Sequence, residues 1–248
     1  MRIIPALLFI GLFLIFGIPV LLIEKLISMV NPKVADFRQL RMVQWAFKVI
    51  LFICGTKVTV IGEENVPTDE PVLYIGNHRS YFDIVISYSR CPRLTGYIAK
   101  DSMRRFLLIS LWMKRLHCLF LKRDDMKQSL RTILVGIEQI KKGISICIYP
   151  EGTRGNGETE LDMLPFKEGS FKIAEKTGCK IIPMAVTGSR DIFEAHLPWI
   201  KRKHVILEYG KPISISELTP QERKKLGDYC QKEILAMLKS HRDMMETK

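Results

Sequence analysis

Runs of apolar residues divide the chain into two parts. Residues 3–23 are almost unbroken apolar, and about twenty such residues suffice to cross a bilayer. They lack the small-x-small cleavage site of a secretory signal, so we expect an uncleaved membrane segment. A second apolar stretch, 42–54, is shorter and carries Lys48, which favours a helix that lies in the membrane interface. Whether the first segment spans the bilayer or only dips into it stays open at this point.

From Lys57 onward, short apolar runs alternate with amphipathic stretches. Strands are expected at 57–61, 72–75, 94–99, 117–121, 144–149, 180–186 and 205–209. Helices are expected at 103–113, 126–140, 168–176 and 226–238. This alternation predicts an α/β fold with a mostly parallel central sheet flanked by helices on both faces. We therefore expect membrane-associated helices in residues 1–56 and one α/β domain in residues 57–248.

Composition reduces the number of possible functions but does not identify one. The 38 Lys and Arg residues exceed the 26 Asp and Glu residues, and a net charge of +12 attracts polyanions. The basic pairs are dispersed and lack the signatures of nucleic-acid modules, so we expect no nucleic-acid partner and favour membrane headgroups or a phosphorylated substrate. The six cysteines show no short-range pairing, as in a reducing compartment, and the histidines show no metal-ligand spacing.

The first candidate site follows the predicted strand at 72–75. A Gly-Asn break places His78 where a strand ends and a helix begins, and ligands bind at such ends in open α/β sheets. Ser80 and Asp83 match a helix-start capping pattern, which lets Asp83 lean back toward His78. A carboxylate there would fix the tautomer of the imidazole, and a neutral, oriented imidazole is a general base. The plainer alternative is that Asp83 only caps the helix and His78 is a loop residue.

The second candidate site follows the predicted strand at 144–149, so we expect it at the same edge of the sheet. Gly152 allows close approach of the backbone, and Thr153 adds a hydroxyl. Arg154 offers a rigid fork suited to phosphate oxygens, while Glu151 would orient Arg154 or bind a substrate hydroxyl. The alternative is a tight turn with a Glu-Arg pair on the surface.

Together these segments resemble the blocks of a known family. Residues 77–83 (Asn-His-Arg-Ser-Tyr-Phe-Asp) resemble the NHxxxxD block, and residues 150–154 (Pro-Glu-Gly-Thr-Arg) the PEGTR block, of the glycerolipid acyltransferases that include 1-acyl-sn-glycerol-3-phosphate acyltransferase. Residues 117–123 and 182–185 are similar to its intervening and last blocks. The four blocks stand in family order. Two departures are a Tyr at 149 and a Gly at 155, where Phe and Ser are common in the family.

The resemblance implies acyl transfer from acyl-CoA or acyl carrier protein to the free hydroxyl of 1-acyl-sn-glycerol 3-phosphate (lysophosphatidate). The product would be phosphatidic acid, and no cofactor other than the thioester co-substrate is expected. His78 would take the hydroxyl proton, Asp83 would orient His78, and backbone amides near Ser80 would stabilise the tetrahedral oxyanion.

The resemblance also implies the binding partners of the chain. Its intervening block makes Arg123 a ligand of the acceptor phosphate. We expect Arg154 and Lys100 to bind the same phosphate, because charged hydrogen bonds suit that task. The amino-terminal helices would contact the membrane bilayer. If the first apolar segment spans the bilayer, the positive charges that follow it place the catalytic domain in the cytoplasm.

Other functions stay open at this point. The acceptor could be glycerol 3-phosphate or a different lysophospholipid. A non-catalytic membrane module that binds phospholipid is a further alternative, although binding alone has no use for a carboxylate beside His78. A hydrolase with Ser80 as nucleophile is disfavoured because no Gly-x-Ser-x-Gly elbow surrounds that serine.

Overall fold

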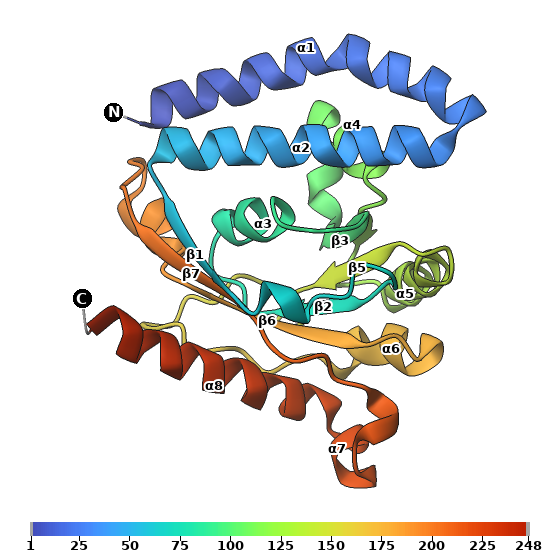
Figure 1. Cartoon of the computed structure of the whole chain (residues 1–248), viewed down its shortest axis with the longest axis vertical. Helices are drawn as coiled ribbons and strands as arrows, with labels where there is room; N and C mark the ends of the chain where they lie inside the picture. The colour runs from blue at the N-terminus through green and yellow to red at the C-terminus, as the bar shows by residue number, and fades with distance from the viewer. Residues whose placement is uncertain (1, 247–248) are drawn as a thin grey trace.

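A seven-stranded sheet forms the centre of the computed structural model, which describes residues 2–246 (Figure 1). Its strands are β1 Lys57–Ile61, β2 Leu73–Gly76, β3 Thr95–Lys100, β4 Leu119–Leu121, β5 Ser145–Ile148, β6 Ile181–Thr187 and β7 His204–Tyr209. The order is β1-β7-β6-β2-β5-β3-β4, and every neighbouring pair is parallel except β6 and β7. The predicted α/β fold with a mostly parallel sheet is confirmed.

Helices cover both faces of this sheet (Figure 1). One face carries α3 Tyr81–Tyr88, α4 Leu107–Arg115 and the hairpin of α1 Ile3–Val30 and α2 Pro32–Cys54. The other face carries α5 Met126–Lys141, α6 Lys172–Thr177 and α8 Leu226–Glu246, with the short α7 Pro220–Lys224 before α8. Because side chains alternate along a strand, Tyr74 of β2 packs into the first core while Leu73 and Ile75 pack into the second.

Several predicted elements differ from the structure in their limits. The helix expected at 168–176 is a 3-10 turn, η3 Glu168–Phe171, followed by α6, and the helix expected at 226–238 extends to Glu246. The helix expected at 103–113 is split into a 3-10 turn, η2 Asp101–Arg105, and α4, and neither start has a capping side chain. The strand expected at 117–121 begins two residues later, at Leu119. There His117 adopts a positive φ of 57°, which turns the chain out of α4 before the strand can start.

The amino-terminal helices form an antiparallel hairpin that lies across α3 and α4 (Figure 1). Asn31 caps α2 by accepting from the backbone N–H of Val34, and Gly55 ends α2 with a φ of 66°. Both helices are longer than the apolar runs that predicted them. Within the described residues, α1 alone is long and apolar enough to cross a membrane, which suggests membrane association. The division into residues 1–56 and 57–248 stays a prediction.

Candidate active site

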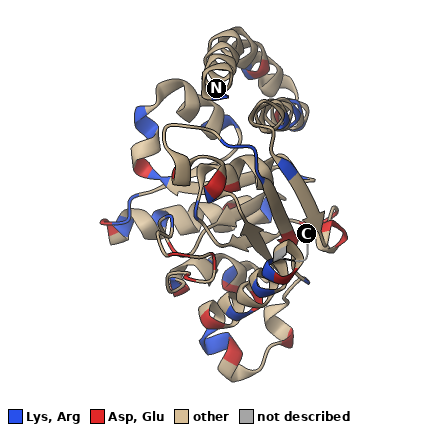
Figure 2. Ribbon diagram, turned by 90° about the vertical axis from the view of Figure 1, so that its left-hand side faces the viewer, with Lys and Arg blue, Asp and Glu red and all other residues tan. Residues whose placement is uncertain are grey.

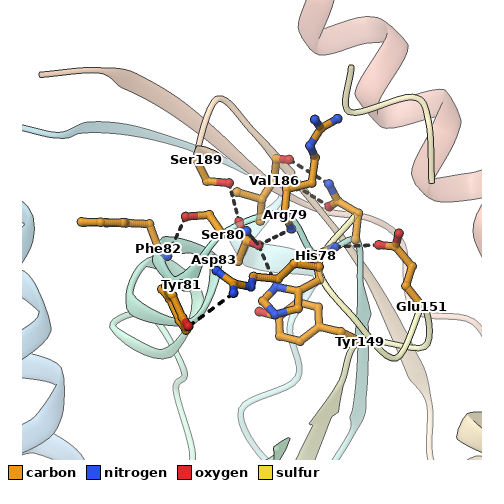
Figure 3. Close-up of polar contacts among 12 residues, drawn as sticks. His78, Arg79, Ser80, Tyr81, Phe82, Asp83, Tyr149, Glu151, Val186 and Ser189 are labelled. Atoms are coloured by element: carbon orange, nitrogen blue, oxygen red, sulfur yellow. Dashed lines mark hydrogen bonds and ion pairs between the residues drawn. The ribbon is translucent and has the colours of Figure 1, made fainter. Parts of the chain in front are cut away.

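His78 and Asp83 meet at the start of α3. The chain leaves β2 at Gly76, and Ser80 caps α3 by accepting from the N–H of Phe82. Asp83 lies in the first turn of the helix, and its Oδ2 is 2.8 Å from Nδ1 of His78 (Figure 3). The helix therefore starts between the two residues, as the capping pattern predicts.

Asp83 is buried and held by several donors. Its Oδ2 also accepts from the backbone N–H groups of Arg79, at 2.7 Å, and Ser80, at 2.8 Å. Its Oδ1 accepts from the hydroxyl of Ser189 (Figure 3). Only 1% of Asp83 is exposed. Because a carboxylate that is already bonded to two amides acts as an acceptor, Nδ1 of His78 carries the proton of the shared hydrogen bond.

The imidazole of His78 lies flat against Tyr149. The ring centroids are 4.3 Å apart and the ring planes differ by 16°. Burial raises the pKa of the Tyr149 phenol well above its usual range, so Tyr149 presents a neutral ring. With Nδ1 bonded to Asp83, Nε2 of His78 has no protein partner within residues 2–246 and keeps its lone pair for a substrate proton.

The loops after β2 and β5 are joined directly. Oε1 of Glu151 accepts from the N–H of His78 at 2.8 Å, and the N–H of Gly155 donates to the carbonyl of His78 at 2.8 Å. Oε2 of Glu151 accepts from the N–H of Leu164 at 2.9 Å, and burial raises the pKa of Glu151. Both oxygens of this buried carboxylate are thus bonded to backbone amides. Glu151 therefore joins the two loops, and the expectation that it orients Arg154 is wrong, because Arg154 bonds to Glu194 instead.

Arg154 reaches the start of α3. Its NH1 is 3.1 Å from Oε1 of Glu194, and its NH2 donates to the hydroxyl of Tyr81 at 3.3 Å. The guanidinium lies over the ring of Tyr81, 4.0 Å from the ring centroid. Gly152, two residues earlier, has a φ of 75°, and a Cβ there would come within 2.9 Å of Nζ of Lys167.

The remaining predicted residues lie at the same edge of the sheet but farther from His78. Thr153 is exposed in the loop after β5. Lys100 ends β3 and Arg123 follows β4, and both are exposed. With adjacent strands about 4.8 Å apart, β3 lies about 10 Å and β4 about 14 Å from β2. Arg154 therefore lies at the start of the helix that carries Asp83, while Lys100 and Arg123 extend a positive region along the edge.

The backbone N–H groups at the start of α3 already have hydrogen-bond acceptors. Each of them bonds within the chain: His78 N to Glu151, Arg79 N and Ser80 N to Asp83, Tyr81 N to Glu194, and Phe82 N to Ser80 Oγ. An oxyanion needs preorganised donors that have no other partner. The expectation that amides near Ser80 stabilise the oxyanion is therefore wrong for this arrangement.

The sequence alone did not reveal Ser189 and Glu194. Both come from the segment that connects β6 to β7, which crosses the start of α3. Asn77 fixes β6 beside this start, because its side chain both donates to and accepts from the backbone of Val186, at 2.9 and 2.8 Å. One signal in the sequence could have pointed to Ser189. It follows the strand predicted at 180–186, and in a parallel sheet that strand ends at the same edge as β2, as the pairing of β6 with β2 shows.

An apolar cavity of about 500 Å³ begins beside Tyr81 and Phe82. It runs between the hairpin and the helices α3 and α4, and its walls include Ile10, Phe13, Phe106 and Trp112. Its size and lining are those of a small-molecule site.

Comparisons with known proteins agree with this geometry. The model of the acyltransferase family matches residues 57–187. A 1-acyl-sn-glycerol-3-phosphate acyltransferase of Saccharomyces cerevisiae is 30% identical over 187 residues, which are 75% of this chain and 60% of that protein. A 1-acyl-sn-glycerol-3-phosphate acyltransferase of Borreliella burgdorferi is 28% identical over 201 residues, 80% of this chain and 78% of that protein.

A solved structure has the same fold. The crystal structure of the 1-acyl-sn-glycerophosphate acyltransferase of Thermotoga maritima superposes with a TM-score of 0.80 over 98% of both chains, at 23% identity. The family model covers more than half of this chain, including both loops that form the candidate site. The chain therefore belongs to the acyltransferase family, and the two relatives compared above are 1-acyl-sn-glycerol-3-phosphate acyltransferases.

Proposed function

We propose that this protein is a 1-acylglycerol-3-phosphate O-acyltransferase, which moves an acyl group from a thioester to the free hydroxyl of lysophosphatidate and so forms phosphatidic acid. The observation that carries the proposal is an imidazole with Nδ1 bonded to a buried aspartate and Nε2 open, close to an arginine and to an apolar cavity. The names of the relatives support the acceptor.

The demanding step of the reaction is the removal of the hydroxyl proton by the base. A thiol, with a pKa near 8.5, leaves readily, whereas an alcohol is a poor nucleophile until its proton is removed. Nε2 of His78 takes that proton while the hydroxyl oxygen attacks the thioester carbonyl, and Asp83 stabilises the imidazolium that forms. The carbon–sulfur bond then breaks, and the proton passes from His78 to the thiolate. No cofactor beyond the thioester, from acyl-CoA or acyl carrier protein, is needed.

The acceptor phosphate is assigned to Arg154, with Lys100 and Arg123 farther along the edge. Within residues 2–246, Arg154 keeps unpaired N–H groups besides those that bond to Glu194 and Tyr81, and a guanidinium binds phosphate through paired hydrogen bonds. The apolar cavity that begins at Tyr81 and Phe82 suits an acyl chain.

The membrane is assigned to the side of the molecule that carries α1. Figure 2 shows this helix, beside the N label, almost free of charged residues, whereas charges of both signs crowd the opposite side around α8. Large apolar side chains along α1, such as Leu8 and Ile15, are exposed. We propose that the hairpin lies in the bilayer surface. We also propose that the domain faces the cytoplasm, a reducing compartment in which the free cysteines of the chain would stay reduced.

One assay tests the proposed function. Detergent-solubilised protein is incubated with labelled acyl-CoA or acyl carrier protein thioester and a panel of acceptors, and the products are identified by mass spectrometry. The panel contains lysophosphatidate, glycerol 3-phosphate and lysolipids with other headgroups. We expect phosphatidic acid from lysophosphatidate as the main product. Preference for another acceptor would change the substrate, and no transfer to any of them would refute the proposed function.

A further inference from the structure

Glu194 links three parts of the candidate site. It lies in the 3-10 turn η5 Glu194–His196 of the β6–β7 connection. Its Oε2 accepts from the hydroxyl of Ser80 at 2.7 Å, and its Oε1 accepts both from the N–H of Tyr81 at 2.8 Å and from NH1 of Arg154 at 3.1 Å. The start of α3 and the loop after β5 are thus tied to one carboxylate (Figure 3 shows Ser80 and Tyr81 at that start).

Arg154 has few other constraints. It lies in a stretch between β5 and the 3-10 turn η3 Glu168–Phe171 that contains no helix or strand. Its second contact, Tyr81, is itself 51% exposed. The side chain of Glu194 is only 13% exposed, against 37% for Arg154, so the carboxylate is the better fixed member of the pair. Among the described residues, Glu194 is the one acidic partner of Arg154.

The Arg154–Glu194 ion pair leaves the guanidinium able to bind a second anion. Arg154 uses one N–H of NH1 for Glu194 and one of NH2 for Tyr81, and its other N–H groups keep the fork that matches phosphate. A guanidinium held in one orientation loses less conformational freedom when an anion binds.

A helix cap alone does not account for Glu194. Ser80 and Asp83 already form the reciprocal capping box of α3, and Ser80 accepts from the N–H of Phe82. Glu194 adds a carboxylate at the N–H of Tyr81, and the same Oε1 also bonds to Arg154. That shared oxygen sets the position of Arg154 relative to the helix that carries Asp83.

We propose that Glu194 is a positioning residue, which holds the guanidinium of Arg154 in place for the acceptor phosphate and thereby sets the affinity for the acceptor. This inference rests on the proposed function. Glu194 itself does not touch the reacting atoms, so its loss acts through Arg154.

The test is the steady-state kinetics of Glu194→Gln with lysophosphatidate and acyl-CoA. The amide oxygen still accepts from Tyr81, but the charge that holds Arg154 is gone. We expect the acceptor KM to rise about tenfold, the size of one charged hydrogen bond, while kcat and the donor KM change by less than about twofold. In an Arg154→Ala background, Glu194→Gln should change the acceptor kcat/KM by less than about twofold, since the group it positions is absent.

Two further variants serve as controls for this result. Glu63→Gln removes a carboxylate from a matched Glu-Arg pair on the surface, Glu63 with Arg90 at 2.8 Å, and should leave every constant unchanged. Glu194→Asp keeps the charge but shortens the reach, and should raise the acceptor KM less than Glu194→Gln. It also replaces Glu194→Gln as the test if the melting temperature shows that the glutamine variant is unfolded.

Several outcomes would overturn the inference. They are an unchanged acceptor KM, a fall in the acceptor KM, a loss confined to kcat, or an equal effect with and without Arg154. A lower KM would mean that the carboxylate repels the phosphate, and a loss in kcat alone would mean that Glu194 acts through α3. These results presuppose an active wild type. If the wild-type protein acylates no acceptor, the proposed function fails instead.

Discussion

At the scale of single residues, the site combines contacts that are local in sequence with contacts that are not. The His78–Asp83 hydrogen bond spans five residues and depends on where one helix starts, so the capping pattern of Ser80 and Asp83 indicated it, and the resemblance of residues 77–83 to a family block favoured it over simple capping. Ser189 bonds to Asp83 from 106 residues away, and Glu194 bonds to Ser80 from 114 residues away. No local pattern encodes such pairs, because they depend on which strands lie next to each other.

Ser189→Ala tests whether the distant contact matters for catalysis. The substitution removes the hydroxyl that bonds to Oδ1 of Asp83 and leaves the other three donors in place. With the carboxylate less firmly oriented, we expect kcat to fall about tenfold, in proportion to one hydrogen bond to a charged group, while the acceptor KM stays within about twofold. Steady-state kinetics with varied acceptor measures both. An unchanged kcat would show that the remaining donors hold Asp83 well enough.

At the scale of elements, the sequence predicted which segments are strands and helices better than it predicted where each begins and ends. Buried runs such as 144–149 and the amphipathic period of α5 are strong signals, and the structure has β5 and α5 there. The left-handed turn at His117 has no such signal, because it is a rare conformation for a residue with a side chain. Hydrophobic periodicity also does not give strand direction, so the antiparallel pairing of β6 with β7 could not be foreseen.

The docking of α8 should depend on pH. His241 in α8 is fully buried; its Nδ1 lies 2.8 Å from Oγ1 of Thr187 and its Nε2 lies 2.7 Å from Oε2 of Glu208. Burial lowers the pKa of His241 below its ordinary value of 6.5, although Glu208 and Glu160 oppose the shift. The unfolded chain therefore binds the proton more readily, so this histidine costs stability as the pH falls below about 6.5.

A matched pair of unfolding curves tests this prediction. Thermal unfolding of the wild type and of His241→Gln is followed between pH 7.5 and pH 5.5. We expect the melting temperature of the wild type to fall more steeply with acidification than that of His241→Gln, whose side chain does not titrate. Equal slopes for the two proteins would show that this histidine contributes nothing to acid sensitivity.

At the scale of the whole molecule, one sheet edge carries the chemistry and one face carries the apolar hairpin. The parallel strands β2 and β5 bring their loops to the same edge, where the bonds among His78, Glu151 and Gly155 join them. The apolar cavity leads from this edge under the hairpin. The sequence indicated both the shared edge and the apolar helices, but it could not show that the helices fold back over α3 and α4.

Exposed apolar side chains on α1 should govern membrane binding. Leu8, Ile15 and Leu22 recur at seven-residue steps and are 61%, 58% and 61% exposed. Burying each in lipid would contribute about 1.5 to 3 kcal/mol, so replacing all three by serine should weaken binding to phosphatidylglycerol-containing vesicles by more than tenfold. Vesicle flotation measures binding, and the retained melting temperature of the variant serves as the control. Undiminished flotation would assign membrane contact to another surface.

The measurement that tests the account most directly is the rate at which His78→Ala forms phosphatidic acid from lysophosphatidate and acyl-CoA. The wild type should turn over, and the variant, matched in melting temperature, should be slower by about a hundredfold to ten-thousandfold, because the group that removes the hydroxyl proton is gone. A variant that retains close to the wild-type rate would contradict the assignment of His78 as the base and, with it, the mechanism proposed for this site.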